Sequence, residues 1–184
     1  MSKILVLTAI EDELGRARVP DGVRVIYTGV GKINAASAAT LALLTLHPDL
    51  VINYGTAGKI NETLRGLVEV SVVIQRDMMA MPLAPRGRTP FAPELDLLRS
   101  GQAGVVCGTG DSFVTSSDPW LIENNIDIVD MELFAVAQVC RRHGLPWRAF
   151  KFITDDANDL AHQDWTANVK DGEGLFWDTL ERIR

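Results

Sequence analysis

Short runs of apolar, β-branched residues recur along this chain, and segments with helical spacing lie between them. Several runs are apolar at nearly every position, a pattern typical of strands that are covered on both faces. The pattern therefore predicts buried strands at Ile4–Leu7, Val23–Tyr27, Leu50–Asn53, Val68–Ile74, Gly104–Cys107, Asp127–Val129 and Trp147–Ile153.

Three other segments have the composition or the spacing of helices. Ile33–Leu46 is rich in Ala and Leu, and its helix is expected to end before Pro48 because proline cannot continue it. Met131–His143 carries apolar residues at helical spacing and is followed by Gly144, a common helix stop. Gly174–Ile183 is predicted to form a closing helix.

Strands that alternate with helices indicate an α/β fold. We expect a single domain over residues 1–184, with three α/β/α layers around a central mixed β-sheet. One segment differs from the rest, because Met78–Pro93 contains four prolines. We predict an irregular surface loop there, of a length that is often functional.

The composition is that of an ordinary globular chain with an acidic balance. The 184 residues include 18 Lys and Arg against 24 Asp and Glu, a formal charge of -6, and 47% are hydrophobic. A nucleic-acid partner would require a basic excess, and no apolar stretch approaches the roughly 20 residues of a membrane span. We therefore expect a cytoplasmic protein that binds a small molecule or another protein, and neither a nucleic acid nor a membrane.

The motifs indicate neither a metal nor a nucleotide cofactor. Cys107 and Cys140 form no C-x-x-C pair and have no His at ligand spacing. Gly29-Val30-Gly31 begins like a dinucleotide-binding motif, but no third glycine follows at the required spacing. We expect no cofactor and no metal.

Small and polar residues follow six of the predicted strands. Ligands of open α/β sheets bind beyond the carboxyl ends of the strands, so these segments are candidates for one site. Acids, hydroxyls and glycines dominate them, and cations are few. The segments are Thr8–Glu13, Thr28–Lys32, Tyr54–Gly58, Gly108–Phe113, Asp130–Glu132 and Thr154–Asp156.

Each acidic segment also has a structural explanation. Glu13 and its acidic neighbours could begin a helix, Glu132 could cap one, and Asp155-Asp156 could cap a turn. If they instead share one concave site, burial and like charge raise their pKa values, which suits acid–base chemistry. Glycosidic bond cleavage, with its cationic transition state, is one option among such hydrolase chemistries.

Taken together and in order, these segments resemble the 5′-methylthioadenosine/S-adenosylhomocysteine nucleosidases of the purine nucleoside phosphorylase superfamily. The resemblance runs from residue 3 to about residue 158 and includes Asn53–Gly58, Gly108–Phe113 and Val129–Glu132. It implies a nucleoside phosphorylase-like fold and an N-glycosidase that uses water to release adenine from nucleosides such as 5′-methylthioadenosine or S-adenosylhomocysteine. It also implies a homodimer and a place in methionine salvage.

The resemblance assigns catalytic roles to two acids. Glu13 is similar to the general base that activates the attacking water. Asp155 is similar to the acid that protonates N7 of the departing purine, with its neighbour Asp156 as the alternative one residue along.

Five further residues match the substrate-binding positions of the family. Glu132 resembles the acceptor for ribose hydroxyls, and Met131 lies at the position against the sugar. Phe113 matches the aromatic residue that stacks on the purine, and the backbone of Val114 would read the purine edge. Thr56 occupies the position of a small hydroxyl residue near the sugar and the nucleophile.

Two other functions stay open at this point. The bacterial phosphorylases of the superfamily hold phosphate with arginines, one of them at the position of Asn53, so its absence favours water as the acceptor. A non-catalytic purine-nucleoside-binding protein would have no use for Glu13 and Asp155 together.

Two features of the sequence differ from the family or fall outside its motifs. Lys151 stands where the family commonly carries an arginine. We interpret Trp120, Trp147, Trp165 and Trp177 as packing residues rather than ligand contacts.

Overall fold

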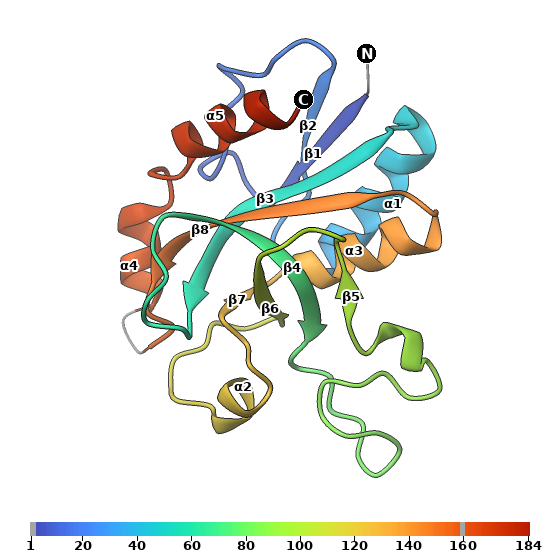
Figure 1. The fold of residues 1–184 in the computed structure, drawn as a ribbon, viewed down its shortest axis with the longest axis vertical. Helices are drawn as coiled ribbons and strands as arrows, with labels where there is room; N and C mark the ends of the chain where they lie inside the picture. The colour runs from blue at the N-terminus through green and yellow to red at the C-terminus, as the bar shows by residue number, and fades with distance from the viewer. Residues whose placement is uncertain (1–2, 159–160) are drawn as a thin grey trace.

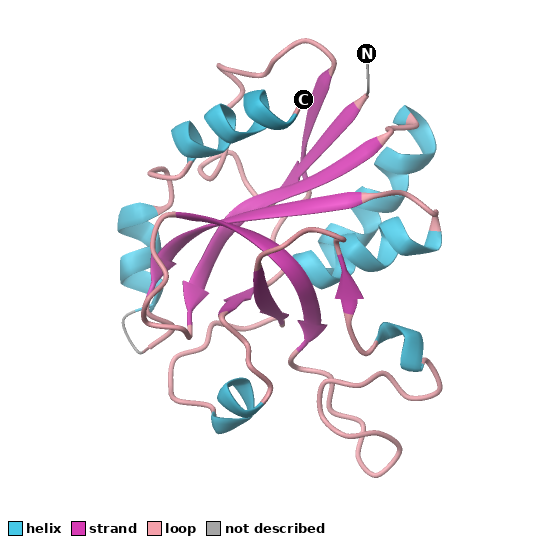
Figure 2. Cartoon of the chain, viewed as in Figure 1, coloured by secondary structure: helices cyan, strands magenta, loops and turns pink. Residues whose placement is uncertain are grey.

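The structure, a computed structural model, describes residues 3–158 and 161–184. In this part of the chain eight strands form one mixed sheet, and helices lie on both of its faces (Figure 1, Figure 2). The strands are β1 (Ile4–Thr8), β2 (Val23–Tyr27), β3 (Leu50–Lys59), β4 (Leu67–Gln75), β5 (Leu98–Arg99), β6 (Val105–Thr109), β7 (Ile128–Asp130) and β8 (Trp147–Asp155). The helices are α1 (Lys32–Leu46), α2 (Pro119–Glu123), α3 (Leu133–Arg142), α4 (Ala161–Asn168), α5 (Glu173–Ile183) and the 3-10 helix η1 (Pro93–Leu95).

Parallel and antiparallel pairs both occur in the sheet. Strand β1 lies between β2 and β3 and is parallel to both. Strand β8 is parallel to β3 and antiparallel to β4, while β6 is parallel to β4 and β7. Because β7 also pairs with the end of β3, the strands β3, β8, β4, β6 and β7 form a closed circuit. This closure brings the ends of β3, β6, β7 and β8 together.

Apolar residues of β1 are buried on both sides of the sheet. Leu5 and Leu7 belong to the core beneath α1 and α3, and Ile4 and Val6 belong to the core beneath α5. Such a strand must be apolar throughout, because neither of its faces meets water. The two cores on opposite faces establish the three α/β/α layers and confirm the predicted fold class.

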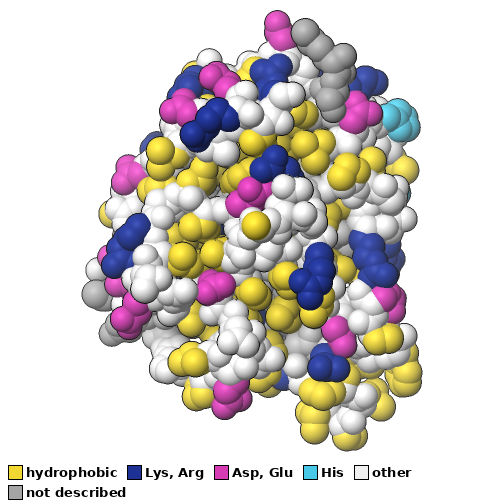
Figure 3. Space-filling model, in the orientation of Figure 1, with side chains coloured by type: hydrophobic (Ala, Val, Ile, Leu, Met, Phe, Trp, Pro, Cys, Tyr) yellow, Lys and Arg dark blue, Asp and Glu magenta, His cyan; other side chains and the backbone are white. Residues whose placement is uncertain are grey.

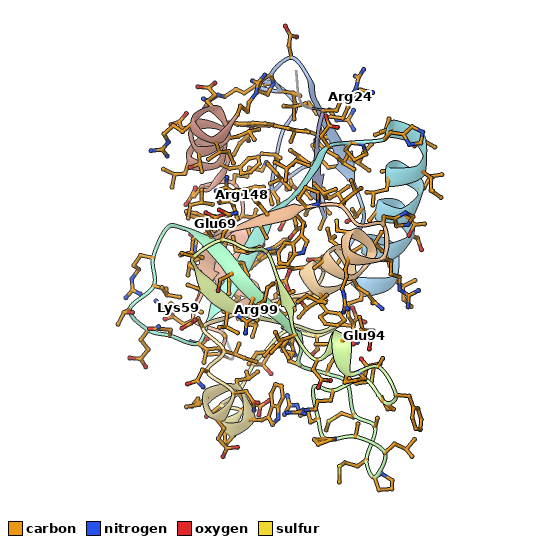
Figure 4. All side chains as sticks on the ribbon, turned by 45° about the vertical axis from the view of Figure 1, so that its right-hand side comes forward. Arg24, Lys59, Glu69, Glu94, Arg99 and Arg148 are labelled. Carbon is orange, nitrogen blue, oxygen red and sulfur yellow. The ribbon has the colours of Figure 1, made fainter. Side chains whose placement is uncertain are left out.

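A half-buried ion pair ties β8 to β4 on the sheet. The Nε and Nη2 groups of Arg148 donate to the two carboxylate oxygens of Glu69 at 2.8 and 3.0 Å, and the two side chains point toward one another in Figure 4. The Arg148 guanidinium also lies 5.2 Å from the ring centre of Phe150. The paired geometry fixes the guanidinium in one plane and so supports the antiparallel register of β4 and β8.

All seven predicted strands form, and β3 continues well beyond its predicted end. The strand runs past Asn53 to Lys59, so Tyr54–Gly58, which was expected to follow the strand, is part of it. The physical reason is that β8 and β7 supply hydrogen-bonding partners along this stretch. The short elements β5, α2 and α4 were not predicted, because their sequences carry little periodicity.

Residues 78–92 are irregular, as predicted, apart from an isolated bridge between Ala80 and Ala84, and Pro93, the last residue of the predicted loop, begins η1. Its apolar side chains are largely in solvent, including Met81 and Phe91. Figure 3 shows hydrophobic side chains gathered at the lower right of the molecule, where Figure 1 places this loop.

Among the described residues, no helix combines the length and the apolar character needed to cross a bilayer.

Close backbone packing at Gly104 gives a test of this fold. A Cβ atom at Gly104 would lie 2.1 Å from the backbone oxygen of Glu69, and backbone cannot move aside as a flexible side chain can. We expect Gly104→Ala to lower the free energy of unfolding by about 2–4 kcal/mol, measured by urea denaturation. The matched control is Gly174→Ala, where the added Cβ meets nothing within 4 Å. The control should be neutral or stabilising by up to about 1 kcal/mol, and equal effects of the two variants would contradict this account.

Candidate active site

A cavity of about 210 Å³ lies at the converging strand ends. All seven residues predicted for the site line it, although they come from five separate stretches of the chain. The lining consists of Ala9, Ile10, Glu13, Val30, Thr56, Ala57, Gly58, Arg76, Ser112, Phe113, Val114, Val129, Asp130, Met131, Glu132, Asp155 and Trp165.

Glu13 lies in the turn after β1, and its buried carboxylate accepts four hydrogen bonds. Thr56 donates to Oε1 from its backbone amide at 2.9 Å and from its hydroxyl at 2.8 Å. Ala9 N and the hydroxyl of Thr8 donate to Oε2 at 3.1 and 3.2 Å. The segment is a turn and not the start of a helix, so the carboxylate is oriented by β1 and β3.

Two glycines of β3 provide the space that two acids need. A Cβ at Gly55 would lie 3.2 Å from Glu13 Oε1 and 3.3 Å from Lys151 Nζ. A Cβ at Gly58 would lie 2.5 Å from Asp155 Oδ1. Any side chain at Gly58 would therefore displace the Asp155 carboxyl from its position.

Asp155 ends β8. Of the two adjacent acids Asp155 and Asp156, it is Asp155 whose side chain lines the cavity. Its Oδ1 accepts a bond from Ala157 N at 3.0 Å and its Oδ2 accepts one from the hydroxyl of Thr154 at 2.9 Å. Burial raises the pKa of Asp155, and these two bonds offset only part of that rise. Asp156 instead lies outside the cavity, where it pairs with Lys59 at 2.8 Å.

Glu132 is the residue before α3, yet its side chain caps a different helix. Its Oε1 accepts a bond from Gly31 N at the start of α1, at 2.8 Å. The start of α3 is capped instead by Asp130, whose Oδ2 accepts from Leu133 N at 2.8 Å. Burial, and then the neighbouring Asp130, raise the pKa of Glu132 to about 7.

A buried ion pair between Lys151 of β8 and Asp130 of β7 lies next to Glu132. Lys151 Nζ is 2.7 Å from Asp130 Oδ2, and both side chains are almost fully buried. Burial raises the pKa of Asp130, but Lys151 outweighs it and holds that pKa below its usual range. Burial likewise lowers the pKa of Lys151, and Asp130 and Glu132 outweigh it and raise that pKa. Both groups are therefore charged, and Lys151 balances the acids around it.

Phe113 and Val114 lie in the loop after β6, and Met131 lies between β7 and α3. Together they form an apolar part of the lining, which also contains the acids. Phe113 remains 42% exposed, so part of its ring lies at the mouth of the cavity. This arrangement suits a ligand with a flat apolar part and a polar part.

Sequence reasoning missed two residues of this lining. Trp165, from α4, was expected to be a packing residue, but it lines the cavity and its Nε1 donates to Thr56 Oγ1 at 2.8 Å. Arg76 follows β4 and is buried, with Nε donating to Gly108 O at 3.2 Å and Nη2 to Gly110 O at 3.1 Å. Neither residue belongs to a local motif, because each reaches the site only through the packing of its element.

Among the side chains that the structure describes, no group of three His, Cys, Asp or Glu is arranged to hold a metal ion.

The fold and this cavity define the class of protein. Residues 17–179 match the phosphorylase superfamily. The native futalosine hydrolase of Helicobacter pylori strain 26695 has the same fold, with a TM-score of 0.87 at 20% identity, over 98% of this chain and 96% of that one. The 5′-methylthioadenosine/S-adenosylhomocysteine nucleosidase of Neisseria meningitidis, solved with methylthio-immucillin-A, gives 0.80 at 22% identity over 94% of both chains.

The relatives found by sequence identity define the family within this superfamily more narrowly. The 5′-methylthioadenosine/S-adenosylhomocysteine nucleosidase of Marinomonas sp. (strain MWYL1) is 30% identical over 170 residues, covering 79% of this chain and 73% of the relative. The protein of the same name from Bacillus subtilis (strain 168) is 31% identical over 172 residues, covering 77% and 72%. The chain therefore belongs to the phosphorylase superfamily and, within it, to the family of these nucleosidases.

The pKa of Glu132 predicts how stability depends on pH. Below about pH 4.5 the carboxyl is protonated whether the chain is folded or unfolded, so it has no differential effect. Between pH 4.5 and about 7 the unfolded chain loses this proton first, which favours unfolding, and above about 7 the penalty is complete.

Glu132→Gln removes this titration and should therefore gain stability relative to the wild type as pH rises. The difference should grow by up to about 3 kcal/mol between about pH 5 and about pH 8. Urea unfolding of both proteins at the two pH values measures it. A constant difference would show that Glu132 titrates normally.

Proposed function

We propose that this protein is a hydrolase that cleaves the N-glycosidic bond of purine nucleosides, with 5′-methylthioadenosine and S-adenosylhomocysteine as the expected substrates and adenine as a product. The observation that carries the proposal is the meeting of Glu13, Glu132 and Asp155 in one cavity with an apolar wall. Membership of the nucleosidase family supports the same reaction, since its curated members carry that name.

Asp155 is proposed as the acid that activates the leaving group. Cleavage of the bond between C1′ and N9 moves an electron pair onto the purine, which is a poor leaving group until N7 receives a proton. Burial raises the pKa of the Asp155 carboxyl, which favours the protonated form that a proton donor needs. The glycine at position 58 leaves room for this carboxyl beside β3.

Glu13 is proposed as the base that accepts a proton from the attacking water. The Thr56 amide and hydroxyl hold Oε1, and Trp165 in turn holds the Thr56 hydroxyl. A carboxylate fixed from both sides can orient a water molecule toward C1′ without rearrangement during the reaction. The water adds to C1′ as its proton passes to Glu13.

Glu132 is proposed to bind the ribose hydroxyls and to stabilise the sugar as it becomes cationic. An ionised carboxylate beside the sugar interacts more strongly with this transition state than with the neutral substrate, so it accelerates the reaction. Because its pKa is about 7, ionisation and hence activity should increase as pH rises through neutrality. Met131 and Phe113 are proposed to pack on the sugar and the purine.

Water fits the site better than phosphate as the acceptor. Asn53 is buried and donates to Leu7 O at 3.0 Å, outside the cavity lining. Arg76 lines the cavity, but its guanidinium bonds to the carbonyls of Gly108, Gly110 and Ser112. Arg16 lies over the ring of Tyr27 instead of in the cavity.

Chromatography of the free base tests the reaction itself. The protein is mixed with methylthioadenosine, S-adenosylhomocysteine, adenosine, inosine or futalosine, with and without phosphate. We expect adenine from the first two substrates at rates that do not depend on phosphate. Strict phosphate dependence would instead indicate a phosphorylase, and release of no base from any substrate would refute the enzyme proposal.

Substitutions of the two acids test their roles. Asp155→Asn and Glu13→Gln should each lower kcat by about 100-fold or more, because each removes one proton transfer. The matched controls are Asp156→Asn and Glu11→Gln, which alter neighbouring acids outside the cavity and should stay within about twofold of wild type. Near wild-type rates for Asp155→Asn or Glu13→Gln, in proteins with unchanged melting temperature, would remove that residue from the mechanism.

We propose in addition that the protein acts as a cytoplasmic homodimer. The support for a dimer is the exposed apolar surface of the Met78–Pro93 loop, where Met79, Met81, Leu83 and Phe91 are each more than two-thirds exposed. Exposed apolar patches of this kind commonly form interfaces.

Sedimentation velocity tests the dimer. The expected mass is twice the 20.2 kDa of one chain, and Leu83→Asp should shift it toward the monomer because the charge opposes burial. The control Ile122→Asp places the same charge on α2 and should leave the mass unchanged. A monomeric wild-type protein would contradict the proposal.

A further inference from the structure

Three charged residues form a closed ring of contacts beside the cavity. Lys32 begins α1, Asp77 follows β4, and Asp111 follows β6. Lys32 Nζ lies 2.5 Å from Asp77 Oδ1 and 3.6 Å from Asp111 Oδ2. The backbone completes the ring, because Lys32 N donates to Asp111 Oδ1 at 2.8 Å and Asp111 N donates to Asp77 Oδ2 at 2.9 Å. We call these three residues the Lys32 cluster.

The Lys32 cluster joins two turns that each supply part of the cavity. The turn Gly29–Lys32 supplies Val30 to the lining, and the loop after Asp111 supplies Ser112, Phe113 and Val114. Neither turn lies within a strand, so the sheet ladder alone does not set the distance between them. The ammonium of Lys32 and the two carboxylates span that gap.

The start of α1 connects the Lys32 cluster to Glu132. Helix α1 has no side-chain cap of its own, since Gly31 stands at its N-cap and no acid lies in its first turn. The free amides at its start are satisfied from elsewhere in the chain: Gly31 N donates to Glu132 and Lys32 N donates to Asp111. The position of Gly31, with φ of 92°, is therefore linked on one side to Glu132 and on the other to the Lys32 cluster.

Other charges around Glu132 come from different elements. Asp130 precedes it on the same stretch, Lys151 lies on β8, and Glu13 lies after β1. None of the three belongs to the Lys32 cluster, so a change at Lys32 would reach Glu132 chiefly through the Gly31 amide.

We propose that Lys32 is a positioning residue, which locks the Gly29–Lys32 turn through Asp77 and Asp111 so that the Gly31 amide holds Glu132 in place to bind the ribose. Lys32 touches no substrate in this proposal. The proposal rests on the proposed function only for the ribose-binding role of Glu132.

The test compares Lys32→Met with Lys32→Arg. Lys32→Met removes the ammonium that contacts both carboxylates, so the turn should shift. We expect KM for methylthioadenosine to rise about tenfold, the loss of roughly one hydrogen bond to a charged group. We expect kcat at neutral pH to fall as well, because less of Glu132 is ionised when its pKa rises. Lys32→Arg keeps the charge and should restore KM to within about threefold of wild type.

A second measurement does not depend on activity. The hydrogen bond from Gly31 lowers the pKa of Glu132, so losing it in Lys32→Met should raise that pKa above its wild-type value. Carbon-13 NMR of the Glu132 carboxyl measures the shift in the free protein. A merely structural loss of packing at Lys32 would lower the melting temperature without moving this titration.

Lys170→Met is the matched control, because Lys170 also pairs with an acid, Asp12 at 3.1 Å, but both side chains are largely exposed and neither lines the cavity. It should leave KM, kcat and the Glu132 titration unchanged. If Lys32→Met does not fold, Asp77→Asn weakens the same ring more mildly and should raise both KM and the pKa of Glu132.

The outcomes separate this proposal from the proposed function. Wild-type protein that cleaves no nucleoside refutes the function, while an NMR titration that is unchanged in Lys32→Met, or in Asp77→Asn where that variant replaces it, refutes the positioning role. Wild-type KM in an active Lys32→Met protein also overturns it. A raised KM with a raised Glu132 pKa, both restored by arginine, supports it.

Discussion

The site depends on one electrostatic constraint: several carboxylates share a small cavity, and one buried ammonium group balances them. Lys151 meets Asp130 at 2.7 Å where almost no water reaches either side chain. Removal of one partner would leave an uncompensated buried charge, which typically costs about 3–5 kcal/mol. The pair leaves Asp130 ionised and lets it cap α3, while Glu132 is left with a raised pKa at the cavity wall.

Strand β3 connects this constraint to the geometry of the reaction. It runs through the site between β1 and β8, and its Thr56 donates two hydrogen bonds to Glu13. Gly55 and Gly58 keep its backbone close to the acids on either side. A sheet that closes through β8 and β7 holds these groups on rigid elements, which suits a reaction that needs two proton transfers at fixed distances.

Local pattern was sufficient for much of the fold. Continuous apolar runs place the strands because burial on both faces excludes polar residues, and helix stops follow from Pro48 and Gly144. Strand ends were less predictable, because the continuation of β3 to Lys59 depends on hydrogen-bonding partners in β7 and β8. Those partners come from sequence more than 60 residues away.

The sequence by itself determined which acids follow the strands, and parallel strand ends bring such residues together. Only the tertiary structure decided how each acid is used. It placed Asp155 in the cavity and Asp156 at the surface, and it turned Glu132 from its own helix toward α1. It also added Arg76 and Trp165 to the site. The burial and the contacts of these two residues depend on which distant elements pack together, and the neighbouring sequence does not indicate that packing.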